Sequence, residues 1–251
     1  MLMQAHRGVS TEYPENTLPA FEAAYEQGYP IIELDPLFTA DGECVTFHDK
    51  TINRTCRNID GTQIEEAICA TDLTLEQLRS YDAGVFMGQE FAGTKVPLLS
   101  EVFDYAEKSG LVVKVDNRFA DFPRWQQEKL FAIAEKSGAE IGFTCKNPEI
   151  TKIVVDRFPS ATIHYDGYVD EALVLQIKQI LKDNPLVVWM ALPSELTSWV
   201  KVPMATPETC QMVKKYGQLG VWILETQEQL QQAKELGADI VETTGAIKPC
   251  K

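Results

Sequence analysis

The chain has little positive charge. It carries 23 lysines and arginines against 37 aspartates and glutamates, so its formal net charge is −14. A nucleic-acid site needs a basic stripe, and none is visible, so we expect no nucleic-acid partner. Docking on an anionic membrane surface is equally disfavoured. An anionic phosphate can still bind locally where a metal ion and one or two arginines reverse the field inside a pocket.

Long apolar runs are also missing. No stretch of about 20 apolar residues exists, so we expect no stable membrane insertion. Because the candidate catalytic segment begins at residue 6, no room is left for a signal peptide, and we expect a cytoplasmic protein, or a periplasmic or secreted one if a leader was removed. Repeats, low-complexity tracts and Gly/Ser linkers are absent too, which predicts one domain over 1–251.

The six cysteines include no Cys-x-x-Cys pair. This spacing excludes a zinc ribbon and a thioredoxin-type centre. We expect free thiols. A pairing of Cys56 with Cys69, which flank one loop-like stretch, is the alternative.

What the chain does have is an alternation of short apolar runs with helical stretches. Strands are expected at 2–5, 30–34, 111–115, 140–144, 161–165, 186–191, 220–224 and 239–241, and helices at 17–27, 100–108, 123–137, 148–158, 170–182, 207–216 and 227–236. Eight strands in a repeated β-then-α order predict a closed (β/α)₈ TIM barrel, whose site lies at the carboxyl ends of the strands. The segment 41–97 interrupts the alternation and is expected to be a small cap inserted after the second strand.

The first fifty residues concentrate the chemistry. They hold two of the three histidines, His6 and His48, and the pair Glu33 and Asp35. In a strand, side chains at i and i+2 leave on the same face, so the two carboxylates lie side by side and suit a hard divalent cation. The histidines could pass a proton to and from a reacting group beside that cation.

Together with these residues, a long ordered set of motifs resembles the glycerophosphodiester phosphodiesterase family. The matches are His6-Arg7-Gly8, Pro14-Glu15-Asn16-Thr17, Glu33-x-Asp35, Thr39-x-Asp41-Gly42, His48-Asp49, Arg54, Asp82-Ala83-Gly84, Pro97-Leu98-x-x-Glu101-Val102 and Trp222. The resemblance implies a metal-dependent TIM-barrel phosphodiesterase that releases glycerol 3-phosphate and an alcohol from a small-molecule glycerophosphodiester. It implies Mg²⁺ or Ca²⁺ on Glu33, Asp35 and a third carboxylate, with His6 and His48 as acid and base.

The third metal ligand departs from the family pattern. Where the family has a glutamate two residues before a lysine, this chain has Asp116 and Arg118. Each charge is kept, but the side chain that carries the carboxylate is shorter by one methylene. Arg118 has a planar guanidinium group where lysine has a compact ammonium group. Toxin phospholipases of the sphingomyelinase D type are similar in using an aspartate there. We expect Asp116 to bind the metal, and Arg118 with Arg7 to bind the substrate.

Other positions have supporting roles or open interpretations. Glu15 is expected to pair with Arg7, and Asn16 to cap the helix that starts near Thr17. Trp222 is either barrel packing or an aromatic wall for the substrate, while His164 is expected to be a packed or surface histidine. Two acidic departures near the mouth, Glu225 and Glu242, suggest a cationic or polyhydroxyl head group.

The sequence favours hydrolysis of a glycerophosphodiester. The alternatives are a phospholipase-D-like or lyase activity on a lysolipid or sugar phosphodiester, and a non-catalytic barrel that binds a phosphodiester. The choice between Mg²⁺ and Ca²⁺, the separate roles of the two histidines, the nucleophile (water or the glycerol 2-hydroxyl) and the oligomeric state are left open.

Overall fold

A computed structural model describes residues 1–192 and 204–249. Eight parallel strands close into a barrel in the order β1, β10, β9, β8, β7, β6, β5, β2. Their bounds are Leu2–His6 (β1), Ile31–Leu34 (β2), Val112–Val115 (β5), Ile141–Cys145 (β6), Ile163–Tyr165 (β7), Leu186–Ala191 (β8), Gln218–Leu224 (β9) and Ile240–Thr243 (β10). The predicted TIM barrel is confirmed, and each of the eight expected strands is present within two residues of its predicted ends.

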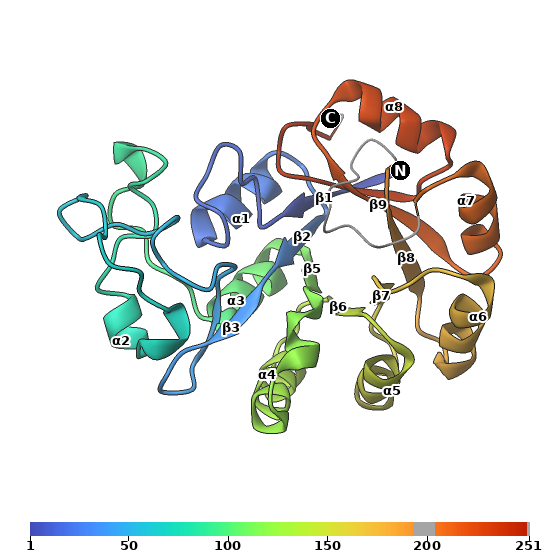
Figure 1. The fold of residues 1–251 in the computed structure, drawn as a ribbon, viewed down its shortest axis with the longest axis horizontal. Helices are drawn as coiled ribbons and strands as arrows, with labels where there is room; N and C mark the ends of the chain where they lie inside the picture. The colour runs from blue at the N-terminus through green and yellow to red at the C-terminus, as the bar shows by residue number, and fades with distance from the viewer. Residues whose placement is uncertain (193–203, 250–251) are drawn as a thin grey trace.

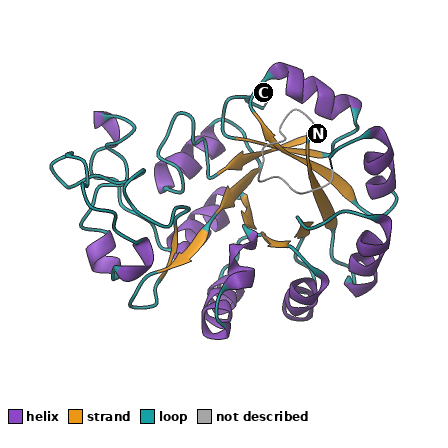
Figure 2. Cartoon of the chain, viewed as in Figure 1, coloured by secondary structure: helices purple, strands orange, loops and turns teal. Residues whose placement is uncertain are grey.

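Helices surround the barrel (Figures 1 and 2). They are α1 (Leu18–Glu26), α3 (Leu99–Ser109), α4 (Arg124–Lys136), α5 (Pro148–Arg157), α6 (Glu171–Ile180), α7 (Pro207–Lys214) and α8 (Gln227–Glu235). Local sequence sets several of their starts: Asn147, Asp170 and Thr226 each accept a hydrogen bond from a backbone N–H of the first helical turn. None of the helices in the described ranges is long and apolar enough to cross a membrane.

The barrel interior changes from apolar to polar along its axis. Ile31, Val187, Trp189 and Ile240 form a buried apolar cluster inside the ring. Further along the same strands the inward positions become polar, and the register pairs His6 with Glu33 and Glu33 with Lys114. Because residues paired in a parallel sheet share a face, these three side chains converge at the carboxyl end of the barrel.

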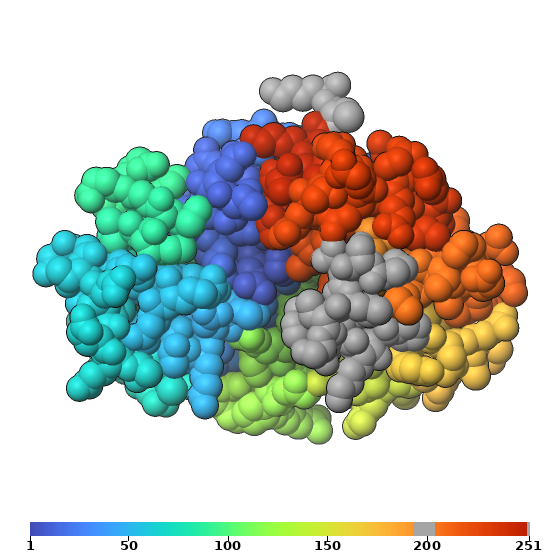
Figure 3. All heavy atoms as spheres, turned by 45° about the horizontal axis from the view of Figure 1, so that its top comes forward, coloured from blue at the N-terminus to red at the C-terminus, as the bar shows by residue number. Residues whose placement is uncertain are grey.

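The expected insertion is present, but it starts before residue 41. β3 (Pro36–Phe38) and β4 (Cys44–Thr46) form a separate antiparallel hairpin directly after β2. The segment continues through η1 (Ala70–Asp72), α2 (Leu75–Leu78) and η2 (Gln89–Phe91), and protrudes on one side of the molecule, in light blue to green (Figure 3). Its start was missed because a single residue, Asp35, separates the hairpin strand from β2.

The inserted segment has a small core of its own. Val45, Ile52, Leu78 and Val96 are buried there. Cys56 lies in the same core, and it and Cys69 are free thiols, so the alternative pairing is wrong. The free-thiol prediction is confirmed for the five described cysteines, and Cys250 lies outside the described residues.

Candidate active site

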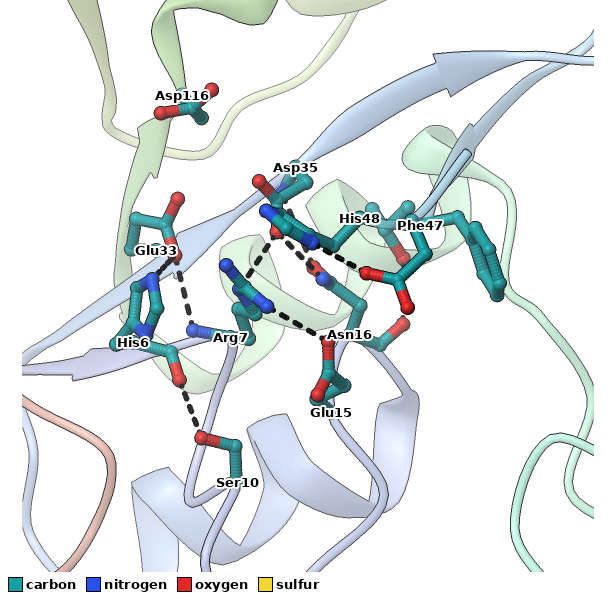
Figure 4. A network of polar contacts seen from close by, with 12 residues as sticks. His6, Arg7, Ser10, Glu15, Asn16, Glu33, Asp35, Phe47, His48 and Asp116 are labelled. Carbon is teal, nitrogen blue, oxygen red and sulfur yellow. Dashed lines mark hydrogen bonds and ion pairs between the residues drawn. The ribbon is translucent and has the colours of Figure 1, made fainter. Parts of the chain in front are cut away.

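A cavity of about 440 Å³ opens at the carboxyl ends of the barrel strands. Its lining includes eight residues predicted from the sequence, namely His6, Arg7, Glu33, Asp35, His48, Asp116, Arg118 and Trp222. It also includes Lys114, Asp166, Ile223 and Glu242. The structure therefore brings the predicted site residues to one pocket, with Glu15 and Asn16 behind it in contact with Arg7 and Asp35 (Figure 4).

Three carboxylates meet in this cavity. Glu33, Asp35 and Asp116 each offer an oxygen, and these oxygens all lie within 4.8 Å of one another. Burial, followed by repulsion from Asp35, raises the pKa of Glu33 well above its ordinary value and raises that of Asp116 as well. Such crowding of buried negative charge favours a cation among the three groups.

The hydrogen bonds of these carboxylates fit a metal site. Glu33 Oε2 accepts a hydrogen bond from the backbone N–H of Arg7 (3.1 Å), and Asp35 Oδ2 accepts one from Asn16 Nδ2 (2.8 Å). Asp116 Oδ1 accepts one from the backbone N–H of Arg118 (3.0 Å). Within residues 1–192 and 204–249 the second oxygen of each has no hydrogen-bond partner. One oxygen orients each group while the other is left for a ligand, as in carboxylate-bound Mg²⁺ or Ca²⁺.

The role expected for Asn16 is wrong. Thr17 is the N-cap of α1, and no side chain caps that helix. Asn16 has a positive φ of 57°, which turns its side chain from the helix toward the end of β2. There its Oδ1 accepts the Asp35 N–H at 3.1 Å while its Nδ2 donates to the Asp35 carboxylate. Asn16 therefore positions Asp35.

A chain of ion pairs links the carboxylates to His48. It runs from Asp35 to Arg7 (3.1 Å), Arg7 to Glu15 (2.9 Å), Glu15 to Arg54 (2.6 Å), Arg54 to Asp49 (2.5 Å) and Asp49 to His48 Nδ1 (2.7 Å). The expected pairing of Glu15 with Arg7 is confirmed. The chain joins β1, β2 and the inserted segment, so it sets the position of His48 relative to Asp35.

The tautomer of His48 follows from its partner. Although partial burial acts in the opposite direction, hydrogen bonds from Arg54 and His48 lower the pKa of Asp49 to about 2. An ionised carboxylate only accepts hydrogen bonds, so His48 Nδ1 carries the hydrogen. In the neutral ring, Nε2 then has a free lone pair.

His6, the last residue of β1, lies close to the triad. Its Nε2 is 3.9 Å from Glu33 Oε2. Burial lowers its pKa, with a smaller opposing effect from Glu242.

Lys114 and Asp166 were not singled out from the sequence. Lys114 is buried and donates to Glu242 at 2.9 Å, and its Nζ lies 4.1 Å from the centre of the Trp189 ring. The spacing of Lys114 two residues before Asp116, on the same strand face, is the signal that could have found it. Asp166 directly follows β7, at the end of the barrel where the site lies.

The negative charge expected from Glu242 at the mouth is balanced by Lys114, and its effect on the head group stays a prediction. Glu242 is buried against Lys114, which neutralises it. Glu225 is exposed and does not line the cavity.

The remaining predicted residues are placed as follows. Arg118 Nη1 donates to the Phe47 carbonyl at 3.3 Å and has no acidic partner in the described part of the chain. Trp222 both packs on the interior apolar cluster and lines the cavity. His164 is buried and accepts from Trp189 Nε1 at 3.0 Å, so the packed-histidine interpretation is confirmed.

Comparisons with known proteins agree with one another. Residues 6–155 match the model of the glycerophosphoryl diester phosphodiesterase family. A protein of Caldanaerobacter subterraneus subsp. tengcongensis named glycerophosphodiester phosphodiesterase is 39% identical over 136 residues, which cover 53% of this chain and 53% of the relative. Glycerophosphodiester phosphodiesterase 1 of Bos taurus is 43% identical over 99 residues, or 39% of this chain and 28% of the relative. The chain thus spans about half or less of the length of these curated relatives.

Solved structures share the fold over nearly the whole chain. A phosphodiesterase of Oleispira antarctica, in complex with the product sn-glycerol-3-phosphate, superposes with a TM-score of 0.76 at 19% identity and covers 98% of this chain and 94% of its own. A glycerophosphodiester phosphodiesterase of Thermotoga maritima has a TM-score of 0.69 at 20% identity, with coverages of 98% and 95%.

Proposed function

Because the chain belongs to the glycerophosphoryl diester phosphodiesterase family, we propose that it hydrolyses glycerophosphodiesters to glycerol 3-phosphate and an alcohol with a bound divalent cation, Mg²⁺ or Ca²⁺. One observation carries the proposal: three carboxylates whose oxygens lie within 4.8 Å of one another share a cavity with His6 and His48. A metal-type ligand set and two proton-transfer groups in one pocket are what phosphodiester hydrolysis requires.

A phosphodiester is anionic and repels nucleophiles, so the site must place positive charge on its phosphoryl oxygens. A cation held by Glu33, Asp35 and Asp116 supplies part of that charge when bound. Arg118 supplies more, since its guanidinium lines the cavity without an acidic partner among the described residues. Arg7, by contrast, is held by Asp35 and Glu15 and mainly fixes the pocket wall.

His48 is the better placed base. Its Nδ1–H is held by Asp49, so Nε2 is free to remove a proton from the nucleophile, which is water or the substrate's glycerol 2-hydroxyl. Asp49 then stabilises the resulting imidazolium, and Arg54 holds Asp49 in place. An early ³¹P spectrum distinguishes the two nucleophiles, because only the 2-hydroxyl gives a cyclic phosphate first.

His6 is then the acid: in its protonated form, which burial makes the minor one at neutral pH, it donates a proton to the departing alkoxide. The assignment predicts different responses to the leaving group. Nitrophenolate departs without a proton, so a p-nitrophenyl phosphodiester should restore much of the activity of His6→Ala and little of that of His48→Ala. Equal rescue of both variants would contradict the assignment.

The test of the function is release of glycerol 3-phosphate from glycerophosphoethanolamine and glycerophosphoglycerol with Mg²⁺, with Ca²⁺ and with EDTA. We expect metal-dependent release that Glu33→Gln and Asp35→Asn abolish. Asp60→Asn is the matched control, since it removes an exposed carboxylate of the inserted segment. Calorimetry should show loss of metal binding in the two triad variants and retention in His6→Ala. A folded protein that binds the metal but releases nothing would instead favour the non-catalytic barrel.

A further inference from the structure

The cavity contains one carboxylate that neither the triad nor an ion pair uses. Asp166 has a single side-chain hydrogen bond within the described residues, a long one from Asn117 Nδ2 at 3.3 Å. Outside the triad the cavity holds two carboxylates, Asp166 and Glu242. Among the described residues Lys114 is hydrogen-bonded to Glu242, and no lysine or arginine is hydrogen-bonded to Asp166. In the part of the chain that the structure describes, Asp166 thus faces the pocket without an ion-pair partner, although the charge of Lys114 still acts on it.

The strand order separates Asp166 from the phosphate-binding groups. The triad and the two arginines come from the ends of β1, β2 and β5, which are neighbours in the ring. Asp166 follows β7, and Trp222 lies on β9. These two strands flank β8, which is the strand opposite β2 in the ring. A substrate substituent that crosses the cavity from the triad would therefore meet Asp166 and Trp222.

These two side chains suit a cation. A carboxylate and the face of an indole are the pair of groups that proteins commonly use to hold an ammonium group. Burial raises the pKa of Asp166 to about 7, with Lys114 acting in the opposite direction, and a cation beside the group favours its ionised form. Trp222 lines the same cavity as Asp166, and it packs on the interior apolar cluster, which fixes the position of its indole.

We propose that Asp166 and Trp222 form a subsite for the ammonium group of an amino-alcohol head group, which makes glycerophospho-amino alcohols the preferred substrate class. The inference rests on the proposed function, and it replaces the earlier expectation that Glu225 and Glu242 select the head group. The phosphodiester lies between the triad and this subsite, with its alcohol substituent toward β7 and β9.

The test compares three substrates at pH 8, above the pKa of Asp166. Glycerophosphoethanolamine and glycerophosphocholine carry an ammonium group, and glycerophosphoglycerol is a neutral diol of similar length. We expect wild-type kcat/KM to be higher for the two cationic substrates. In Asp166→Asn the ratio of cationic to neutral kcat/KM should fall about tenfold or more, mainly through KM, because the isosteric amide keeps the shape and loses the charge.

Glu225→Gln is the matched control. It removes a negative charge just after β9 but outside the cavity, so the ratio should not change. Choline or ethanolamine alone should inhibit wild type competitively and Asp166→Asn only weakly. This measurement and the wild-type substrate ranking still apply if Asp166→Asn folds poorly.

The possible failures are distinct. No release from any of the three substrates by folded, metal-loaded protein would contradict the proposed function itself. Release from glycerophosphoglycerol, with no preference for the cationic substrates and an unchanged ratio in folded Asp166→Asn, would overturn the subsite and leave the phosphodiesterase in place.

Discussion

The buried ion pair between Lys114 and Glu242 gives a quantitative prediction. The two charges are 2.9 Å apart, and each side chain is only 6% exposed. With an effective dielectric constant of about 20, charges at that separation attract with about 6 kcal/mol, which offsets much of the cost of removing both from water. Burial acts to lower the pKa of Lys114, but the charges of Glu242 and Glu33 outweigh it and the pKa is raised. Burial acts to raise the pKa of Glu242, but the charge of Lys114 outweighs it and the pKa is lowered. Both groups are therefore ionised near pH 7.

Removal of one partner leaves the other charged and buried. We expect Lys114→Met and Glu242→Leu each to lower the free energy of unfolding by about 3–5 kcal/mol. The double variant leaves no unpaired charge, and its remaining defect is Gln4, which loses its hydrogen bond to Glu242. That loss costs about 1–3 kcal/mol, so the double variant should be more stable than either single variant or close to the better of them.

Urea unfolding of the four proteins at pH 7 measures these differences, provided that the slope with urea is unchanged. The coupling energy between the two substitutions should be at least about 2 kcal/mol. If the losses in free energy of unfolding of the two single variants simply add in the double variant, Lys114 and Glu242 do not stabilise each other.

Three further predictions concern other parts of the chain. Gly8→Ala should destabilise the protein by about 1–3 kcal/mol or more in urea, because φ is +79° there and a Cβ would lie 2.7 Å from Ala20 backbone atoms; an unchanged midpoint would refute it. Cys56, whose pKa burial raises to about 12, should react with a thiol reagent only after unfolding, and rapid labelling of the native protein would contradict its burial. The pKa of Asp49 is lower in the folded state, so its stabilising effect is present above its unfolded pKa of about 3.9 and is lost as the pH falls toward 2; the difference in urea midpoint between wild type and Asp49→Asn should narrow over that interval, and a constant difference would count against the Arg54 contact.

The barrel was predictable because each strand has a recognisable local sequence pattern. An apolar run such as 186–191 is buried on both faces, and the helices between the strands show the 3.6-residue spacing of one buried side. The rule that parallel barrels place their site at the carboxyl ends of the strands predicts that residues 6, 33, 35 and 116 share one cavity, and they do.

Contacts across the barrel interior were not predictable in the same way. Lys114 and Glu242 are 128 residues apart, and only closure of the ring brings their side chains together. Glu242 taken alone looked like free negative charge at the mouth. The left-handed conformation of Asn16 is likewise invisible in a Pro-Glu-Asn-Thr segment that reads as an ordinary helix start, so a helix cap was expected where the structure has a support for Asp35.

The aspartate that follows β5, where the family pattern has a glutamate, has a structural reason of its own. Asp116 is the N-cap of η3 (Asn117–Asp121), and its Oδ1 accepts the backbone N–H of Arg118 at 3.0 Å. Aspartate is among the best residues for this role, because its short side chain folds back onto the first turn. One oxygen thus sets the turn that carries Arg118, while the other is left to the triad. The aspartate and the arginine are therefore linked through one turn, and the pair of substitutions is consistent with a retuned site rather than with the loss of metal binding.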